Sequence, residues 1–183
     1  MNKVYDLQNF EPIEHWRTFD KETNLMFPWY TRPFLKHLLG FQMKDWKIFE
    51  YGGGDSTIWW RKYSREVHSV DTNISWSKKC DLIYVNDKID FLSYPLKLID
   101  DEKFDCIIID GEPVQWRDEC TEYALKAIKN GGIIIADNYH QKTVDLEHWT
   151  KTDELLKGYE KNVFKEPDHP DWKTACWKIE NSR

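Results

Sequence analysis

Two uninterrupted apolar runs restrict the fold of this chain more than any other feature of its sequence. The runs are Cys106-Ile107-Ile108-Ile109 and Ile133-Ile134-Ile135-Ala136, and neither contains a polar residue. A strand with one face in water alternates apolar and polar residues, whereas a strand covered by helices on both faces is apolar throughout. The runs therefore predict two central strands of a parallel sheet that has helices on both sides.

Strand-like and helix-like segments alternate along the chain from Trp46 onward, which is typical of a parallel sheet with helical connections. The expected strands are Lys47 to Tyr51, Glu66 to Asp71, Leu82 to Val85, Phe104 to Asp110 and Gly132 to Asp137. Residues 162–164 and 174–179 are expected to form an antiparallel hairpin at the end of the chain. The connection from Asn86 to Lys103 is short for a full helix and predicts a reduced crossover.

Length, composition and charge define the kind of molecule to expect. The 183 residues are enough for one domain with a sizeable core, so we expect a single domain over residues 1–183. Because the sequence contains neither a membrane-spanning apolar run nor a secretory signal, we expect a cytoplasmic protein without a membrane partner. The four cysteines form no CxxC pair, which predicts reduced thiols. The net charge of -6 disfavours nucleic acid as a partner.

The segment from Ile48 to Thr57 combines an apolar strand, the turn Gly52-Gly53-Gly54 and a helix that Asp55 or Ser56 can cap. Glycines let the backbone turn tightly and approach a ligand closely, and the start of a helix offers unpaired amide donors. Nucleotide-like ligands bind to this geometry. The segment therefore predicts a nucleotide-type cofactor site, with a plain flexible turn as the alternative.

Two carboxylates accompany the glycine turn. Asp71 ends the next expected strand. In nucleotide sites built on a strand, a glycine turn and a helix, an acidic residue at this position accepts from the ribose hydroxyls. A solvated aspartate at a strand end is the alternative for this residue. Glu50 ends the first strand directly before the turn, and we expect it either to accept from a ligand ammonium group or to orient the amides of the turn.

Four stretches of the sequence resemble the class I S-adenosylmethionine-dependent methyltransferases, and the resemblance extends from about Pro28 to Ile179. These stretches are 49–56, 69–71, 104–111 and 130–138. The resemblance implies an α/β, doubly wound, mostly parallel seven-stranded sheet with an antiparallel C-terminal strand, in which residues 1–30 form an N-terminal extension or lid. It implies S-adenosylmethionine as cofactor and methyl transfer to a small-molecule acceptor, with oxygen as the expected acceptor atom.

The resemblance also assigns residues to the cofactor, although the sequence departs from the family pattern. The turn reads E-Y-G-G-G-D-S, with Ser56 in place of a third glycine, and the stretch that would contact adenine, around Asn86 and Asp87, is only loosely similar. Trp76 is a further candidate to flank the adenine. The implied cofactor-binding residues are Glu50, Gly52, Gly53, Gly54, Ser56, Asp71, Asp87 and Asp110.

Residues after the fourth and fifth expected strands are candidates for chemistry. Asp110, Asp137 and Asn138 resemble the magnesium-binding triad of catechol-type O-methyltransferases, and oxygen ligands suit Mg²⁺. Those enzymes also carry a lysine base shortly after the first carboxylate, whereas here Gly111-Glu112-Pro113 follows, which favours a metal-free pocket.

The candidate bases for removing a proton from the acceptor are Asp110, Glu112 and His140. Arg117 is expected either to receive an anionic substrate group or to pair with Asp118 or Glu119.

Two other functions compete with methyl transfer. A nicotinamide-dependent oxidoreductase uses the same strand, turn and helix, but Thr57 stands where the GxGxxG pattern requires its last glycine. A non-catalytic module with the same fold would bind a partner through its aromatic surface. The retained carboxylates Asp71 and Asp110 argue against that alternative.

Overall fold

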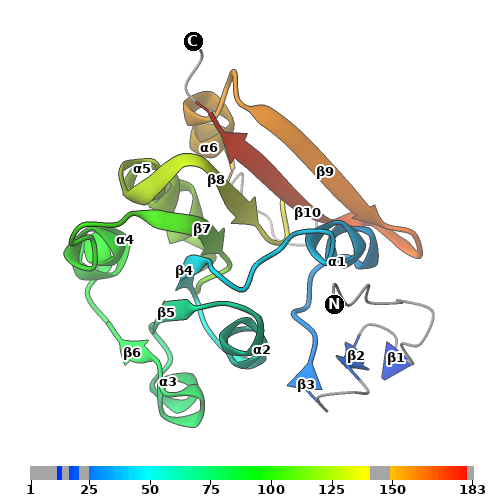
Figure 1. Cartoon of the computed structure of the whole chain (residues 1–183), viewed down its shortest axis with the longest axis horizontal. Coiled ribbons are helices and arrows are strands. Elements are labelled where there is room, and N and C mark those ends of the chain that lie inside the picture. The colour runs from blue at the N-terminus through cyan, green and yellow to red at the C-terminus, as the bar shows by residue number, and fades with distance from the viewer. Residues whose placement is uncertain (1–11, 14–16, 21–24, 141–148, 181–183) are drawn as a thin grey trace.

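The computed structural model describes residues 12–13, 17–20, 25–140 and 149–180, and its main feature is a seven-stranded sheet (Figure 1). The strands lie in the order β6-β5-β4-β7-β8-β10-β9. Their bounds are β4 (Lys47–Tyr51), β5 (Glu66–Asp71), β6 (Ile83–Tyr84), β7 (Phe104–Ile109), β8 (Ile128–Ala136), β9 (Glu160–Glu166) and β10 (His169–Ile179). Within this sheet β10 alone opposes the other strands, which confirms the predicted antiparallel C-terminal strand.

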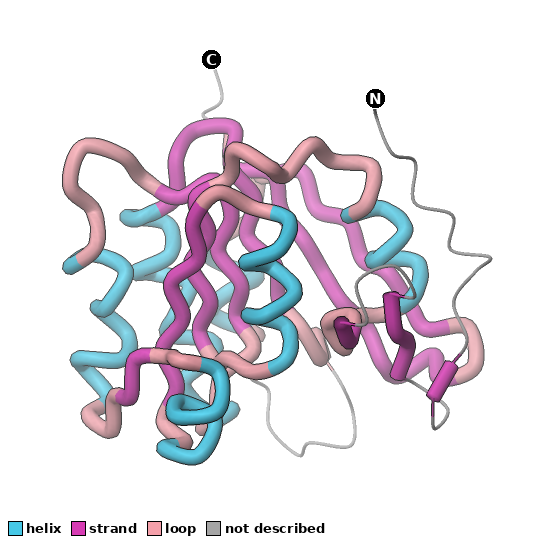
Figure 2. The backbone as a smooth tube through the Cα atoms, turned by 60° about the horizontal axis from the view of Figure 1, so that its bottom comes forward, coloured by secondary structure: helices cyan, strands magenta, loops and turns pink. Residues whose placement is uncertain are grey.

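Helices cover both faces of the sheet (Figures 1 and 2). One face carries α4 (Lys88–Lys97), α5 (Arg117–Ala127) and α6 (Thr150–Leu155), with the short helix η3 (Val114–Trp116) leading into α5. The other face carries α1 (Arg32–Leu38), α2 (Asp55–Tyr63) and α3 (Ile74–Cys80). Successive strands are added on one side of β4 up to β6, and from β7 onward they are added on its other side. This reversal of strand order confirms the predicted doubly wound α/β fold.

The two apolar runs form the centre of the core, as predicted. Along β7, Ile107 and Ile109 pack with the helices of one face, and Cys106 and Ile108 pack with α1 and α2 on the other. All four side chains are fully buried. Because burying one such isoleucine stabilises the folded state by about 1.5–3 kcal/mol, a polar residue at any of these four positions would be costly.

The predicted reduced crossover between Asn86 and Lys103 is wrong, because the chain forms the ten-residue helix α4 there. The helix fits because β6 already ends at Tyr84 and the side chain of Asp87 caps the helix by accepting from the N–H of Asp90 at 2.9 Å. Asp87 is exposed and serves the helix start. The turns around α4 are short, which leaves enough residues for a full helix.

The first part of the described chain forms a small sheet with the order β1-β2-β3, from β1 (Pro12–Ile13), β2 (Arg17–Asp20) and β3 (Leu25–Met26). Strand β3 contacts α2. Much of the lid predicted over residues 1–30 lies outside the described residues. The four cysteines are buried free thiols. None of the helices in the described ranges has the length and apolar character needed to cross a bilayer.

Candidate active site

A pocket of about 400 Å³ lies at the carboxyl ends of the parallel strands, where the winding direction of the sheet changes. Ligands of open α/β sheets bind at this position. Three of the predicted site residues, Glu50, Asp87 and His140, do not line the pocket. The predicted site residues that do line it are Gly52, Gly53, Gly54, Ser56, Asp71, Asp110, Glu112, Asp137 and Asn138.

The glycine turn brings the ends of β4 and β7 into backbone contact. Gly52 has φ +80°, and its N–H donates to the carbonyl of Val70 at 2.8 Å. A Cβ atom at this position would lie 2.3 Å from the Cα atom of Gly111. Glycine is therefore required by both the backbone conformation and the close approach, and the amides of the turn stay next to the pocket.

Asp71 is held directly against the turn. Its carboxylate accepts from the N–H of Gly53 at 2.9 Å and from the N–H of Asn73 at 2.6 Å. Burial raises the pKa of Asp71 above its usual value, while the two backbone hydrogen bonds lower it. Asp71 and the turn both line the pocket, so the structure brings these predicted site residues together.

Glu50 lies beneath the turn and is completely buried. Its carboxylate accepts hydrogen bonds from the hydroxyls of Ser56, Thr57 and Ser69. The Thr57 hydroxyl in turn accepts from the N–H of Gly54 at 3.2 Å. Burial raises the pKa of Glu50 to about 7. Of the two expected roles, this geometry matches orientation of the turn, which Glu50 performs through Thr57.

The acidic corner is the name we give to the ends of β7 and β8, with Asp110, Asp137 and Asn138. Burial raises the pKa of Asp110 to about 6, even though the neighbouring Arg117 lowers it. Asp137 is 3% exposed and accepts from the Thr174 hydroxyl at 2.9 Å. Burial and the nearby Asp110 raise its pKa well above the usual range. The corner thus holds two carboxyl groups with a strong tendency to keep or take up a proton.

Arg117 lies buried at the start of α5 and points into the acidic corner. Its guanidinium pairs with Asp110, and this finding corrects the expected pairing with Asp118 or Glu119. Asp118 accepts instead from the N–H groups of residues 151 and 152, and Glu119 pairs with Lys88 at 2.6 Å.

The other two candidate bases lie in different surroundings. Glu112 is exposed at the rim of the pocket, and its carboxylate accepts from the N–H of Val114 at 3.1 Å. His140 has φ +49°, and its Nε2 atom lies 2.8 Å from a carboxylate oxygen of Asp153. The structure therefore brings Glu112 to the pocket and turns His140 toward α6.

Three tryptophans border the pocket. Trp76, at the start of α3, is 36% exposed and has the Lys79 ammonium over its ring at 4.4 Å. Trp29 belongs to the segment that was expected to form a lid, and it is 49% exposed. Trp172 is the one residue of β10 that lines this pocket. The sequence had indicated Trp76 by itself and Trp29 as part of the expected lid over residues 1–30, but no local signal indicated Trp172.

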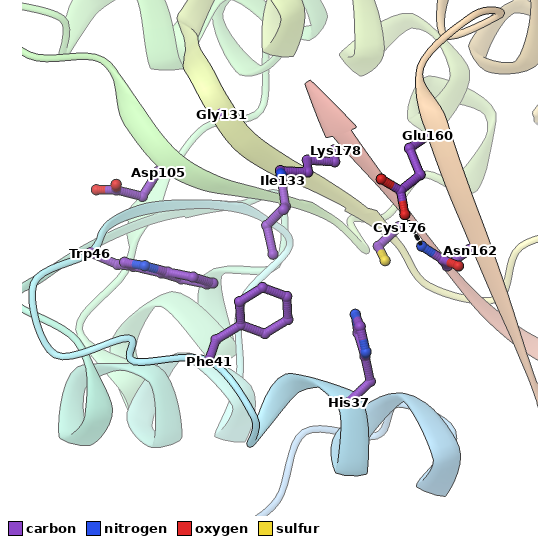
Figure 3. Close-up of a pocket in the computed structure, with 10 residues that line it drawn as sticks. All are labelled: His37, Phe41, Trp46, Asp105, Gly131, Ile133, Glu160, Asn162, Cys176 and Lys178. Carbon is purple, nitrogen blue, oxygen red and sulfur yellow. Dashed lines mark hydrogen bonds between the residues drawn. The ribbon is translucent and has the colours of Figure 1, made fainter. Parts of the chain in front are cut away.

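A second pocket of about 300 Å³ lies at the opposite edge of the sheet, near the amino ends of β7 and β8 (Figure 3). The rings of Trp46, Phe41 and His37 border one side of it. Its charged groups have partners within the protein, because Asp105 pairs with Lys129 and Lys178 pairs with Glu180. The glycine turn and the acidic corner are at the other edge, which makes the first pocket the candidate active site.

The strand order, the antiparallel last strand and the glycine turn facing Asp71 together define the class I methyltransferase fold. Among solved structures, the chain is similar to a protein from Clostridium thermocellum assigned as an rRNA methylase, with 13% identity, a TM-score of 0.63 and coverage of 84% of this chain and 98% of the other. No family sequence model and no curated protein sequence matches the chain.

Two similar structures contain a cofactor or its product. The O-methyltransferase TomG from Streptomyces achromogenes, involved in tomaymycin synthesis and bound to S-adenosylmethionine, is 19% identical, with a TM-score of 0.57 and coverage of 79% and 78% of the two chains. The O-methyltransferase from Bacillus cereus, bound to S-adenosylhomocysteine, is 21% identical, with a TM-score of 0.52 and coverage of 72% and 73%. At these identities the likeness establishes the fold.

Proposed function

We propose that this protein is an S-adenosylmethionine-dependent methyltransferase that acts on a small-molecule acceptor. The observation that carries the proposal is the hydrogen bond between Gly53 and Asp71, next to a pocket that continues to Asp110 and Asp137. The presence of S-adenosylmethionine or its product in solved structures with this fold supports the choice of cofactor.

The residues of the turn side fit an adenosine-type ligand. A carboxylate at position 71 can accept from both ribose hydroxyls, while the turn at 52–54 leaves room for the amino acid part of the cofactor. The exposed ring of Trp76 offers a stacking surface for adenine. The ionised carboxylate of Asp110 complements a positively charged sulfur atom.

The chemistry requires alignment and the removal of one proton. S-adenosylmethionine supplies an electrophilic methyl group on a positively charged sulfur. The protein holds the acceptor in line between the turn and the acidic corner, which lowers the entropic part of the barrier. Asp110 is our candidate base, because its pKa of about 6 makes it an ionised carboxylate that still accepts a proton readily near neutral pH. Glu112 is the second candidate.

A neutral acceptor with a hydroxyl oxygen is the substrate that we propose. The pocket volume of about 400 Å³ suits a small molecule together with part of the cofactor. Its carboxylates disfavour an anionic acceptor, and the net charge of -6 opposes binding to an RNA backbone. Trp29 and Trp172 offer apolar contact area for the acceptor.

Titration with S-adenosylhomocysteine tests the proposed function, with Asp71→Asn and Asp87→Asn as matched variants. Loss of the carboxylate at 71 is expected to weaken binding roughly 10- to 100-fold, because two ligand hydroxyls lose a charged acceptor. Asp87→Asn removes the same charge from a helix cap outside the pocket and is expected to leave affinity unchanged. Calorimetry that detects no binding to the wild-type protein, or binding of NADH in its place, would contradict the proposal.

A further inference from the structure

The acidic corner presents oxygen atoms of the kind that hold a hard cation. Asp110 follows β7, and Asp137 and Asn138 follow β8, so their backbone and side-chain oxygens converge at one edge of the sheet. Within the described residues, no group of three or more His, Cys, Asp or Glu side chains is arranged to hold a metal ion. The cation that does contact the corner belongs to the protein itself, as the guanidinium of Arg117.

The guanidinium of Arg117 is bound to this corner from several directions. Its Nε atom donates to the carbonyl of Gly111 at 2.9 Å, and Nη1 donates to the carbonyl of Asp137 at 3.1 Å and to Oδ1 of Asn138 at 3.3 Å. Its Nη2 atom donates to the carbonyl of Asp110 at 2.9 Å and lies 3.1 Å from Oδ1 of the same residue. Four of the five N–H donors of the guanidinium thus form hydrogen bonds, and its charge is paired with the Asp110 carboxylate.

This arrangement fixes both the charge and the geometry of the corner. A buried guanidinium is stable only where its donors are satisfied and a carboxylate balances its charge, and both conditions hold here. With four of its N–H groups hydrogen-bonded inside the protein and its charge paired with Asp110, Arg117 presents no free fork of donors to an anionic substrate group. A divalent ion at the same oxygens would lie within a few ångströms of a fixed positive charge, which is strongly unfavourable in a buried site.

We propose that Arg117 is the resident cation of the acidic corner: it takes the position of the divalent ion that the three oxygen-bearing residues would otherwise bind, and it joins the ends of β7 and β8. Arg117 is thereby a positioning residue that aims the carboxylate of Asp110 into the pocket. The occupancy of the corner is independent of the reaction, and only the consequence for Asp110 as a base rests on the proposed function.

Binding of Mn²⁺, followed by electron paramagnetic resonance, tests this proposal on the full chain. Wild-type protein and Asp110→Asn are expected to bind Mn²⁺ equally weakly, because the wild-type corner is already occupied. Arg117→Met, which removes the charge and keeps an unbranched side chain, is expected to gain one Mn²⁺ site that binds at least roughly tenfold more tightly. The double variant Arg117→Met with Asp110→Asn should lose that site.

Arg117→Lys is the matched control, because it keeps a positive charge in the corner and is expected to gain no Mn²⁺ site. Binding of S-adenosylhomocysteine and circular dichroism report whether each variant is folded. Two results would overturn the proposal. One is a Mn²⁺ site in the wild-type protein that Asp110→Asn abolishes. The other is a folded Arg117→Met protein that gains no Mn²⁺ site. An absence of methyl transfer would count against the proposed function and leave the Mn²⁺ result intact.

Discussion

Glu50 supports the candidate cofactor site from beneath. Its three hydrogen bonds from hydroxyl groups hold the start of α2 against β4 and β5, and through Thr57 they fix an amide of the glycine turn. The carboxyl group of Glu50 retains its proton to a higher pH than usual, because burial disfavours the charged form more than the three hydroxyls favour it. Folding stability must therefore depend on the titration of this residue.

Comparison of the wild-type protein with Glu50→Gln isolates that dependence. The pKa of Glu50 is raised from 4.5 to about 7 on folding, so its stabilising contribution is fully present below the unfolded value and is lost as pH rises through 7. Relative to Glu50→Gln, the wild-type free energy of unfolding is expected to fall by about 3 kcal/mol between about pH 4 and about pH 8. Urea denaturation across this range measures the difference, and parallel curves for the two proteins would refute the assignment.

For single residues, the sequence is informative where the signal for a residue lies in the residues next to it in the chain. The turn at 52–54 and Asp71 were predictable because a strand end, a glycine and a cap are local signals. The contacts of Arg117 were not, because its partners come from the ends of two different strands. His140 was expected to be a base on the strength of its pKa range, but the chain's left-handed conformation at this residue directs its ring to Asp153.

At the scale of elements, the ends of β4 and β7 approach each other closely beside the pocket. A Cβ atom on Gly52 would meet the backbone of Gly111, which cannot move without shifting a central strand. Gly131 offers a matched comparison, because it has a similar φ of +86° and its added Cβ would meet nothing within 4 Å.

Gly131→Ala and Gly52→Ala should therefore differ in stability. The alanine at 131 is expected to cost about 1–2 kcal/mol from backbone conformation alone. The alanine at 52 should cost at least about 1–3 kcal/mol more, because the strands must also separate, and cofactor affinity should fall with it. Denaturation midpoints and calorimetry give both quantities. Equal losses of stability in the two variants would show that the close approach has no energetic weight.

Most elements were predictable because apolar runs end at clear turn residues, and β4 and β5 begin and end as the pattern indicated. The start of β8 was not predicted, since the pattern placed the beginning of this strand at Gly132 and the structure places it at Ile128. In the structure Ile128 pairs with Phe104, and an irregularity in register separates this pair from Cys106 and its partner. The pairing of Ile128 with Phe104 depends on the position of β7, which no local pattern in the sequence of β8 encodes.

At the scale of the whole molecule, charge and pocket together restrict the acceptor. The chain has a net charge of -6, and the pocket is rich in carboxylates. Incubation with a labelled methyl donor and a cell extract is expected to place the label in the small-molecule fraction, because phosphate backbones are repelled. Recovery of the label in RNA, with a yield that falls steeply as salt is added, would contradict this expectation.

The order of β9 and β10 in the sheet has a consequence for how the protein folds. β9 precedes β10 along the chain, yet β10 lies between β9 and β8. Because β10 is the only neighbour of β9 in this sheet, β9 cannot join the sheet until β10 has been synthesised. The sheet is completed only when β10 inserts, and that same insertion delivers the Thr174 hydroxyl to Asp137. The hydrogen bond from Thr174 to Asp137 therefore forms only after β10 has paired with β8, whereas the Arg117 contacts of the acidic corner do not involve β10.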